Sequence, residues 1–123
     1  MMRSLVVKVT SGGDSTAEAE RCNQGFTVAA AAVAAGAEVS LWLTGEAAWF
    51  GVAGRAEAFS LPLATPLADL RDTVLADGRV TVCSQCAARR GIEADDVLGG
   101  VRIAGAAVFA EEALRDGAQA LVY

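Results

Sequence analysis

Histidine is absent from this chain of 123 residues. No imidazole is therefore available as a general base, as the partner of a nucleophile or as a metal ligand. Cysteine is scarce, and three residues in a chain of this size do not indicate a framework of structural disulfides. If the protein carries out chemistry, we expect sulfur to do it.

Positive charge is also in short supply. Ten basic residues against fifteen acidic ones give a formal net charge of -5. This balance argues against broad, sequence-independent binding of DNA or RNA, because such binding neutralises phosphates with cations. Binding of a small anionic ligand is still compatible with this net charge.

Long hydrophobic runs are missing as well. Residues 5–9 come directly after the first four residues and are too short for the core of a signal peptide. Residues 26–37 are mostly alanine and include Gly36, so they do not form a membrane span. We therefore expect no targeting segment, no membrane contact and a cytoplasmic location in which thiols stay reduced. With 54% hydrophobic residues, residues 1–123 should form one compact domain.

Apolar runs alternate with helical patterns along the chain. Ser15 and Glu18 form a capping box at the start of the first helix, and Pro66 suits the first position of the second. Continuous apolar strands separated by helices predict an α/β fold with a parallel sheet covered on both faces. We expect strands at residues 4–10, 38–43, 79–82, 101–104 and 118–123, helices at residues 15–35, 65–77, 84–90 and 106–115, and a loop or short helix at residues 44–54.

Four connections should meet at the carboxyl ends of these strands, where open parallel sheets bind ligands. They are residues 11–14, 44–49 and 83–86 and the turn at Gly105. We expect Gly12, Glu46 and Trp49 to contribute to binding there. Gly12 itself lies in a plain turn, because no phosphate-binding glycine pattern is present. Trp49 and Phe50 either wall the site or contact a partner, or they form a local hydrophobic plug.

The segment Cys83-Ser84-Gln85-Cys86 ends an apolar strand and begins a helix. Unpaired N–H groups at a helix N-terminus favour the thiolate over the thiol. We expect Ser84 to be the N-cap, which puts Cys83 just outside the helix and Cys86 in its first turn. Arg89 and Arg90 follow closely and can stabilise a sulfur anion or a bound acidic group. Alternatively, both cysteines are small buried hydrophobic residues.

A C-x-x-C pair has three usual meanings. Zinc requires four ligands, and this chain offers one pair, one distant cysteine and no histidine, so we expect no metal. A thioredoxin-like motif is followed by a proline-bearing loop, whereas both prolines here precede the motif. A cysteine nucleophile or sulfur carrier remains, with the second cysteine as a resolving group. Cys22 lies on the apolar face of the first helix and is predicted to pack in the core, and Asp95-Asp96 is typical of a solvated turn.

The sequence resembles the DsrE/DsrF-like family of small sulfur-relay proteins over nearly the full length of the chain. The most specific part runs from Val82 to Ile92 and is similar to the family's active cysteine loop, followed by a helix that ends in Arg-Gly. Residues 5–11 are similar to the opening strand and loop. Residues 23–39 are similar to the first helix and second strand, and residues 105–112 to the last helix.

The resemblance implies a three-layer α/β/α fold with a five-stranded parallel sheet. It also implies homo-oligomers, typically trimers or hexamers, and a cysteine that carries sulfur as a persulfide. Cys83 matches the active cysteine, and Cys86 matches a second cysteine that only some members have. The paired cysteines look more like the stand-alone branch than the relay subunits of the tRNA-thiolation and sulfite-reductase systems, which work in mixed complexes.

The resulting hypothesis is a cysteine-based sulfur carrier, similar to a sulfurtransferase, that takes sulfur from a donor protein and passes it to an acceptor protein. We expect it to need no cofactor. Its predicted catalytic residues are Cys83 and Cys86, and its predicted binding residues are Ser84, Gln85, Arg89, Gly12, Glu46 and Trp49. Two alternatives remain open at this point. The protein is either a non-catalytic oligomeric binding or scaffold protein with structural cysteines, or a thiol enzyme that reduces peroxide.

Overall fold

The computed structural model describes residues 3–123. Met1 and Met2, which belong to the start at which we expect no targeting segment, lie outside the described residues. In chain order the elements are β1 (Ser4–Val9), α1 (Thr16–Ala34), β2 (Glu38–Leu43), the 3-10 helix η1 (Gly45–Gly51), α2 (Leu67–Asp77), β3 (Arg79–Cys83), α3 (Ser84–Arg89), β4 (Arg102–Ala104), α4 (Ala106–Ala113) and β5 (Ala118–Val122).

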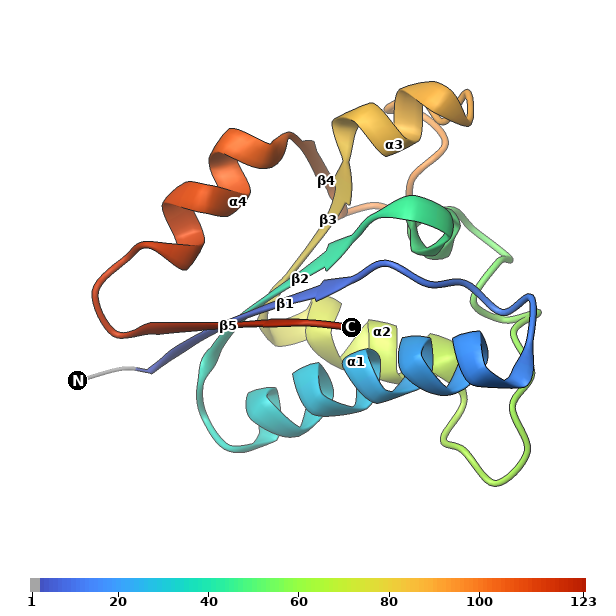
Figure 1. Cartoon of the computed structure of the whole chain (residues 1–123), viewed down its shortest axis with the longest axis horizontal. Coiled ribbons are helices and arrows are strands. Elements are labelled where there is room, and N and C mark those ends of the chain that lie inside the picture. Colours follow the sequence, from blue (N-terminus) through green and yellow to red (C-terminus); the bar gives the residue numbers. More distant parts are fainter. Residues whose placement is uncertain (1–2) are drawn as a thin grey trace.

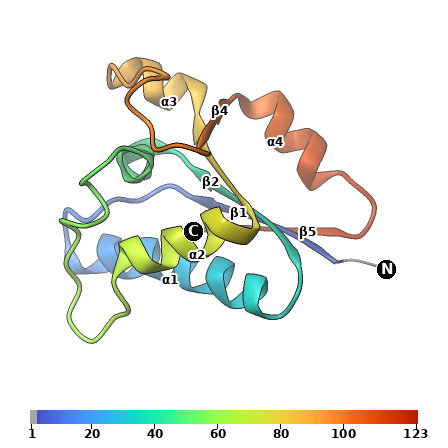
Figure 2. The same ribbon diagram turned by 180° about the vertical axis from the view of Figure 1, so that it is seen from behind.

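The five strands form one sheet in the order β4-β3-β2-β1-β5, and every neighbouring pair is parallel. Helices α1 and α2 cover one face, and α4 lies against the other (Figures 1 and 2). The short helix α3 stands at the carboxyl end of β3 (Figure 1). The α/β fold with three layers and a five-stranded parallel sheet is therefore confirmed. Within residues 3–123, no helix combines the length and apolar character needed to cross a bilayer.

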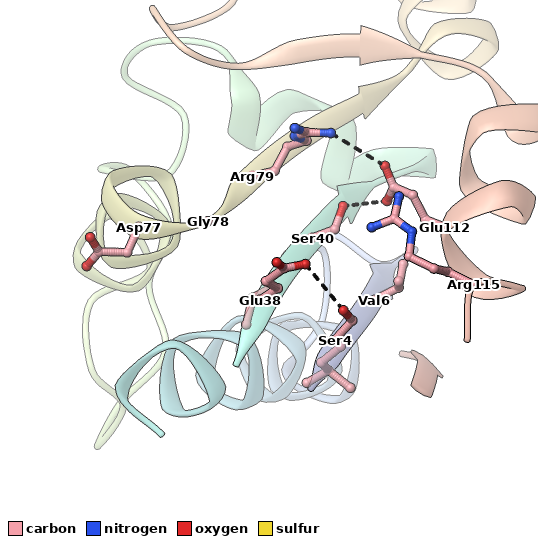
Figure 3. A pocket seen from close by; sticks show the side chains of 11 residues that line it. Ser4, Val6, Glu38, Ser40, Asp77, Gly78, Arg79, Glu112 and Arg115 are labelled. Atoms are coloured by element: carbon pink, nitrogen blue, oxygen red, sulfur yellow. Dashed lines mark hydrogen bonds and ion pairs between the residues drawn. The ribbon is translucent and has the colours of Figure 1, made fainter. Parts of the chain in front are cut away.

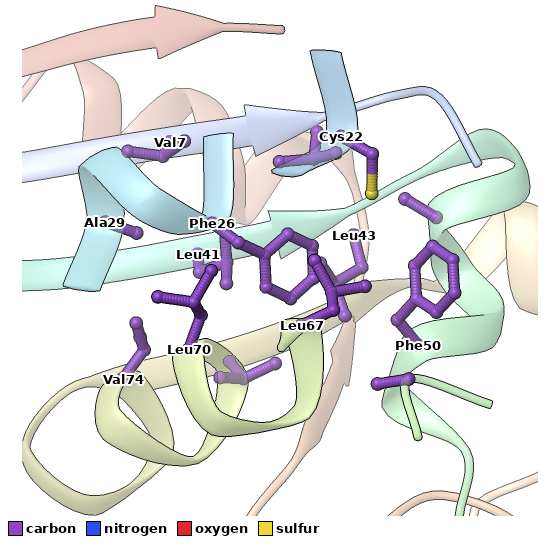
Figure 4. Packing of buried hydrophobic residues seen from close by; sticks show 14 of the residues in the cluster. Val7, Cys22, Phe26, Ala29, Leu41, Leu43, Phe50, Leu67, Leu70 and Val74 are labelled. Atoms are coloured by element: carbon purple, nitrogen blue, oxygen red, sulfur yellow. The ribbon is translucent and has the colours of Figure 1, made fainter. Parts of the chain in front are cut away.

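The main core lies between the sheet and the layer of α1 and α2 (Figure 4). Helix α1 begins as predicted, because the Ser15 side chain caps it by accepting from the backbone N–H of Glu18 at 3.2 Å. Its inward face carries Cys22 and Phe26, both fully buried against strand residues such as Leu41. Cys22 thus packs in the core, as expected. Burying a side chain of the size of Phe26 contributes about 1.5–3 kcal/mol.

Several element boundaries differ from expectation by one to two residues. Pro66 precedes α2 instead of opening it, because its ψ of 132° is extended, and the helix begins at Leu67. Strand β3 reaches Cys83, one residue beyond the apolar run. Helix α4 ends at Ala113 rather than Arg115. Gly36 does follow the end of α1, with a φ of +88° that favours glycine.

A buried carboxylate attaches α4 to its face of the sheet. Glu112 is 7% exposed, and its side chain accepts hydrogen bonds from Ser40 Oγ at 2.6 Å and from Trp42 Nε1 at 2.9 Å. Arg102 Nη2 donates to it at 2.7 Å from β4. Burial alone would raise the pKa of Glu112, but these donors and the Arg102 charge outweigh it and hold the pKa below its usual range.

Replacing Glu112 with Gln should lower the free energy of unfolding by about 2 kcal/mol at neutral pH, because Arg102 loses its charged partner. A carboxyl with a lowered pKa in the folded state stabilises the fold above its unfolded pKa, and the effect is lost as the pH falls through the folded value. The difference between wild type and variant should therefore shrink below about pH 4.3. Urea unfolding between neutral pH and pH 3 measures this difference in the free energy of unfolding, with Glu111→Gln at the exposed neighbouring position as control. An unchanged gap down to pH 3 would contradict this account.

Candidate functional site

Cys83 occupies the junction between β3 and α3. Along β3, Val80 and Val82 point into the core, so Thr81 and Cys83 point to the face that carries α4. Cys83, with φ −63° and ψ 127°, is itself the N-cap of α3. The expectation that Ser84 caps the helix is therefore wrong, and Ser84 is its first residue. The strand pairing of Cys83 with Ala104 extends β3 by one residue and moves the cap to the cysteine.

The surroundings of Cys83 favour its anionic form. The thiol is half-buried, and desolvation alone would raise its pKa. The backbone N–H and thiol of Cys86, the backbone N–H of Gln85 and the charge of Lys8 together outweigh that penalty. The pKa of Cys83 therefore lies below its usual value. A thiolate at this place can act as a nucleophile toward sulfur.

Cys86 faces Cys83 from one side and the start of η1 from the other. The backbone N–H of Gly45 donates to Cys86 Sγ at 3.2 Å, and the cysteine also packs against the core. Gly45 has a φ of +54°, and a Cβ on it would lie 2.6 Å from the carbonyl oxygen of Thr10. Only glycine fits this approach. The connections after β1 and β2 therefore meet at the second thiol.

An arginine ties α3 to η1 next to Cys86. Arg90 Nε donates to Glu46 Oε2 at 2.7 Å, and Arg90 Nη1 donates to the carbonyl oxygen of Cys86 at 3.1 Å. Glu46, predicted as a binding residue, is about half exposed in this ion pair. Through these contacts, Arg90 and Glu46 hold the cysteine segment in place.

Other predicted residues lie farther from the two thiols. Gly12 is buried beneath Glu46, where a Cβ would come within 2.9 Å of the Glu46 Cβ. Gln85 presents its side chain to solvent, and Arg89 is exposed in the last turn of α3. Ser84 lies beside the start of α4, since a Cβ on Gly105 would meet its Oγ at 3.2 Å.

The aromatic pair of η1 is divided between two environments. Phe50 is buried and packs edge-on against Phe26 and Phe59, at centroid distances of 6.2 and 5.6 Å. Trp49 is half-buried, and the Arg55 guanidinium lies 4.1 Å from its ring centroid. Phe50 is thus the hydrophobic plug, and it offers no surface to a ligand.

Sequence reasoning missed Lys8. It lies between Val7 and Val9 on β1, both of which point into the core, so the alternation of a strand turns Lys8 toward α4. Its charge contributes to the lowered pKa of Cys83. As the one polar residue in the apolar run of residues 5–9, it could have been identified from the sequence.

A pocket of about 340 Å³ lies at the opposite end of the sheet (Figure 3). It is formed by the amino ends of β1, β2 and β3 and by Glu112 and Arg115. Arg79 lines it at one end of β3, whereas Cys83 is at the other end. Its lining mixes acidic and basic side chains and includes no thiol, so we assign it no part in sulfur chemistry. Throughout residues 3–123, no three Cys, Asp or Glu side chains gather as metal ligands would.

Comparison with known proteins places this geometry in a family context. A sequence model described as the DsrE/DsrF-like family matches residues 6–122. The solved structure of the ychN protein from E. coli is similar to the chain, with 19% sequence identity, a TM-score of 0.79 and coverage of 100% of both chains. No curated protein sequence matches.

Two further solved structures are similar to the chain, and both are described as proteins of unknown function. MTH1491 from Methanobacterium thermoautotrophicum is 10% identical, with a TM-score of 0.69 and coverage of 98% of this chain and 99% of that one. BT1422 from Bacteroides thetaiotaomicron is 15% identical, with a TM-score of 0.58 and coverage of 98% and 94%. Identities this low establish the shared fold alone.

Alkylation of the folded protein should separate the three thiols. Burial raises the pKa of Cys22 to about 12, so iodoacetamide at neutral pH should leave it unmodified until the protein is denatured. Cys83 should be labelled fastest, as peptide mass spectrometry can measure, and Cys83→Ser should abolish the fast phase. If Cys83 reacts as slowly as Cys22 in the folded state, the thiols are structural, and the scaffold alternative is favoured.

Proposed function

Because the chain belongs to the DsrE/DsrF-like family, we propose that it is a sulfur carrier that holds a persulfide on Cys83 and passes the terminal sulfur to an acceptor thiol. The observation that carries the proposal is the position of Cys83. It is a half-exposed thiol at the N-cap of α3, with a lowered pKa. Cys86 lies next to it as a second thiol.

The loading step needs only the Cys83 thiolate and a persulfide donor. Cys83 Sγ attacks the terminal sulfur of the donor, a new S–S bond forms, and the donor's own S–S bond breaks. The donor leaves as a thiolate, and Cys83 becomes a persulfide. The N–H groups that favour the Cys83 anion are already in place, so the attacking sulfur need not be deprotonated by a separate base.

Two routes release the sulfur. An acceptor thiolate can attack the terminal sulfur, which restores the Cys83 thiolate. Alternatively, the Cys86 thiolate attacks Cys83 Sγ, which forms a Cys83–Cys86 disulfide and expels the terminal sulfur as hydrosulfide. In the second route both cysteines are oxidised and the sulfur is reduced, so an external dithiol must restore the pair. The Gly45 N–H and the Arg90 contact hold Cys86 in position for the second route.

The remaining predicted residues complete the proposed site. Ser84 and Gln85 flank Cys83 at the start of α3, and Gly12, Glu46 and Trp49 belong to the connections that follow β1 and β2. We propose that they shape the approach of donor and acceptor proteins. Arg89, exposed on α3, is proposed to contact the same partners. Cys83 and Cys86 are free, as the proposed transfer requires. We propose a reducing, cytoplasmic location for the protein, where thiols stay reduced.

Sulfur loading is testable by intact-protein mass spectrometry after incubation with a low-molecular-weight persulfide. Wild type and Cys22→Ser should each gain the mass of one sulfur atom, located on Cys83 by peptide mapping. Cys83→Ser should not gain it, and Cys86→Ser should retain it longer than wild type because the intramolecular release is lost. Equal loading of wild type and Cys83→Ser would refute the proposal.

We also propose self-association, as a trimer or hexamer. The support is apolar surface on and near the edge strand β5: Leu114 is 83% exposed, Val122 65% and Leu121 40%. Strand β5 carries no charged residue and leaves one edge unpaired among the described residues, a combination that monomeric proteins usually avoid. A second copy of the chain would cover this surface.

Light scattering during size-exclusion chromatography should give three or six times the 12.5 kDa mass of one chain. Val122→Asp should reduce the measured mass, because a charge at the edge opposes burial against another copy. Ala31→Asp, which adds the same charge at an exposed position of α1, should leave the mass unaltered. A monomeric wild type would be incompatible with the proposed assembly.

A further inference from the structure

Lys8 lies on the same face of the sheet as Cys83. The parallel register pairs Lys8 with Trp42 and Trp42 with Thr81, so these three residues form one row across β1, β2 and β3. Cys83 is two residues beyond Thr81 and therefore points to the same side. Two strand spacings, about 10 Å, separate β1 from β3. The long side chain of lysine spans part of that distance.

Aromatic side chains hold the Lys8 ammonium over the sheet. Lys8 Nζ is 5.1 Å from the centroid of the Phe109 ring on α4. Phe109 in turn packs edge-on against Trp42, with ring centroids 5.4 Å apart. A cation over a ring face is attracted to it but keeps its full charge. Within residues 3–123, no carboxylate forms an ion pair with Lys8.

The other charges on this face are paired or lie at the opposite end of the sheet, as do Glu38 and Arg79, which begin β2 and β3. Arg102 on β4 and Glu112 on α4 form an ion pair at 2.7 Å, so their opposite charges offset each other. On α3, the neighbouring titratable group is Cys86, and Arg89 is exposed at the helix's far end. On η1, Glu46 is paired with Arg90. Among residues 3–123, Lys8 is thus the charge without an ion-pair partner at the carboxyl end of the face that Cys83 shares. It is also the only lysine in the chain.

We propose that Lys8 supplies the positive charge that keeps the sulfur on Cys83 anionic, first as the attacking thiolate and then as the terminal sulfur of the persulfide. The chemical part of this inference rests on the proposed sulfur-carrier function. Its electrostatic part concerns the Cys83 thiol alone and holds whether or not sulfur is the cargo. Lys8 acts through space and forms no bond with the cargo, so it is a positioning residue. The lowered pKa of Cys83, to which Lys8 contributes, agrees with the geometry.

The test is the pH dependence of Cys83 alkylation, followed on its own peptide by mass spectrometry. Lys8→Met keeps the aliphatic chain and removes the charge, so the rate at neutral pH should fall roughly threefold to fivefold, with the pH midpoint shifted upward. Lys8→Arg keeps the charge and should stay close to wild type. Salt near 1 M should shrink the difference, because the Debye length falls to about 3 Å. Arg21→Met, an equal charge change at an exposed position of α1, is the matched control.

A Lys8→Met profile that superimposes on wild type would overturn the proposal, as would an equal shift in Arg21→Met. If Lys8→Met does not fold, acetylation of this single lysine in the folded protein removes the same charge, and reductive methylation retains it. Sulfur loading is measured in parallel. Failure of every variant, including wild type, to load sulfur would refute the carrier function, whereas the alkylation profiles would still decide the role of Lys8.

Discussion

The parallel pairing of β1, β2 and β3 determines where the candidate site lies. Because the strands run in the same direction, their carboxyl ends come together at one edge of the sheet. The carbonyl oxygen of Thr10 then approaches Gly45 so closely that no side chain fits, and the N–H of Gly45 reaches Cys86. The Cys86 thiol, three residues beyond the end of β3, therefore meets residues that are distant in the chain without any need for a deep cavity.

The two faces of the sheet have different chemistry. The face toward α1 and α2 is filled with side chains such as Phe26 and Leu41, which bury Cys22 away from water. The face toward α4 carries Ser40, Trp42, Thr81, Arg102 and Lys8, and it is bound to α4 through Glu112. The same chain thus holds the Cys22 thiol in an apolar layer and the Cys83 thiol on the face that carries charged side chains. Burial raises the pKa of the first, and local donors and charge lower the pKa of the second.

The architecture was accessible from sequence because the alternation of apolar strands with helices determines it. Glu38–Leu43 was located without error, since the turn at Gly36 and the connection after Leu43 bound it clearly. The position of the cysteines at the sheet edge followed from the same pattern. What local patterns could not settle was the cap of α3. Strand pairing with Ala104 carries β3 to Cys83, and this contact is between segments far apart in the chain.

The electrostatics of the site were less accessible for the same reason. Arg89 is near Cys83 in sequence, but the helix carries it away into solvent, while Lys8 reaches the shared face from 75 positions earlier through the sheet register. Phe50 was ambiguous because its burial depends on Phe26 and Phe59, on either side of it in the chain.

The strand order has a consequence for how the protein matures. Strand β1 lies between β2 and β5, and Thr10 and Tyr123, which are 113 positions apart, are joined by a hydrogen bond of 2.8 Å. During synthesis on the ribosome, β1 can pair with β2 early, but its other edge stays open until β5 emerges. Contacts so distant in sequence slow folding. The nascent chain therefore leaves one edge of β1 unpaired until β5 is available, and an unpaired strand edge is a template for pairing with another chain.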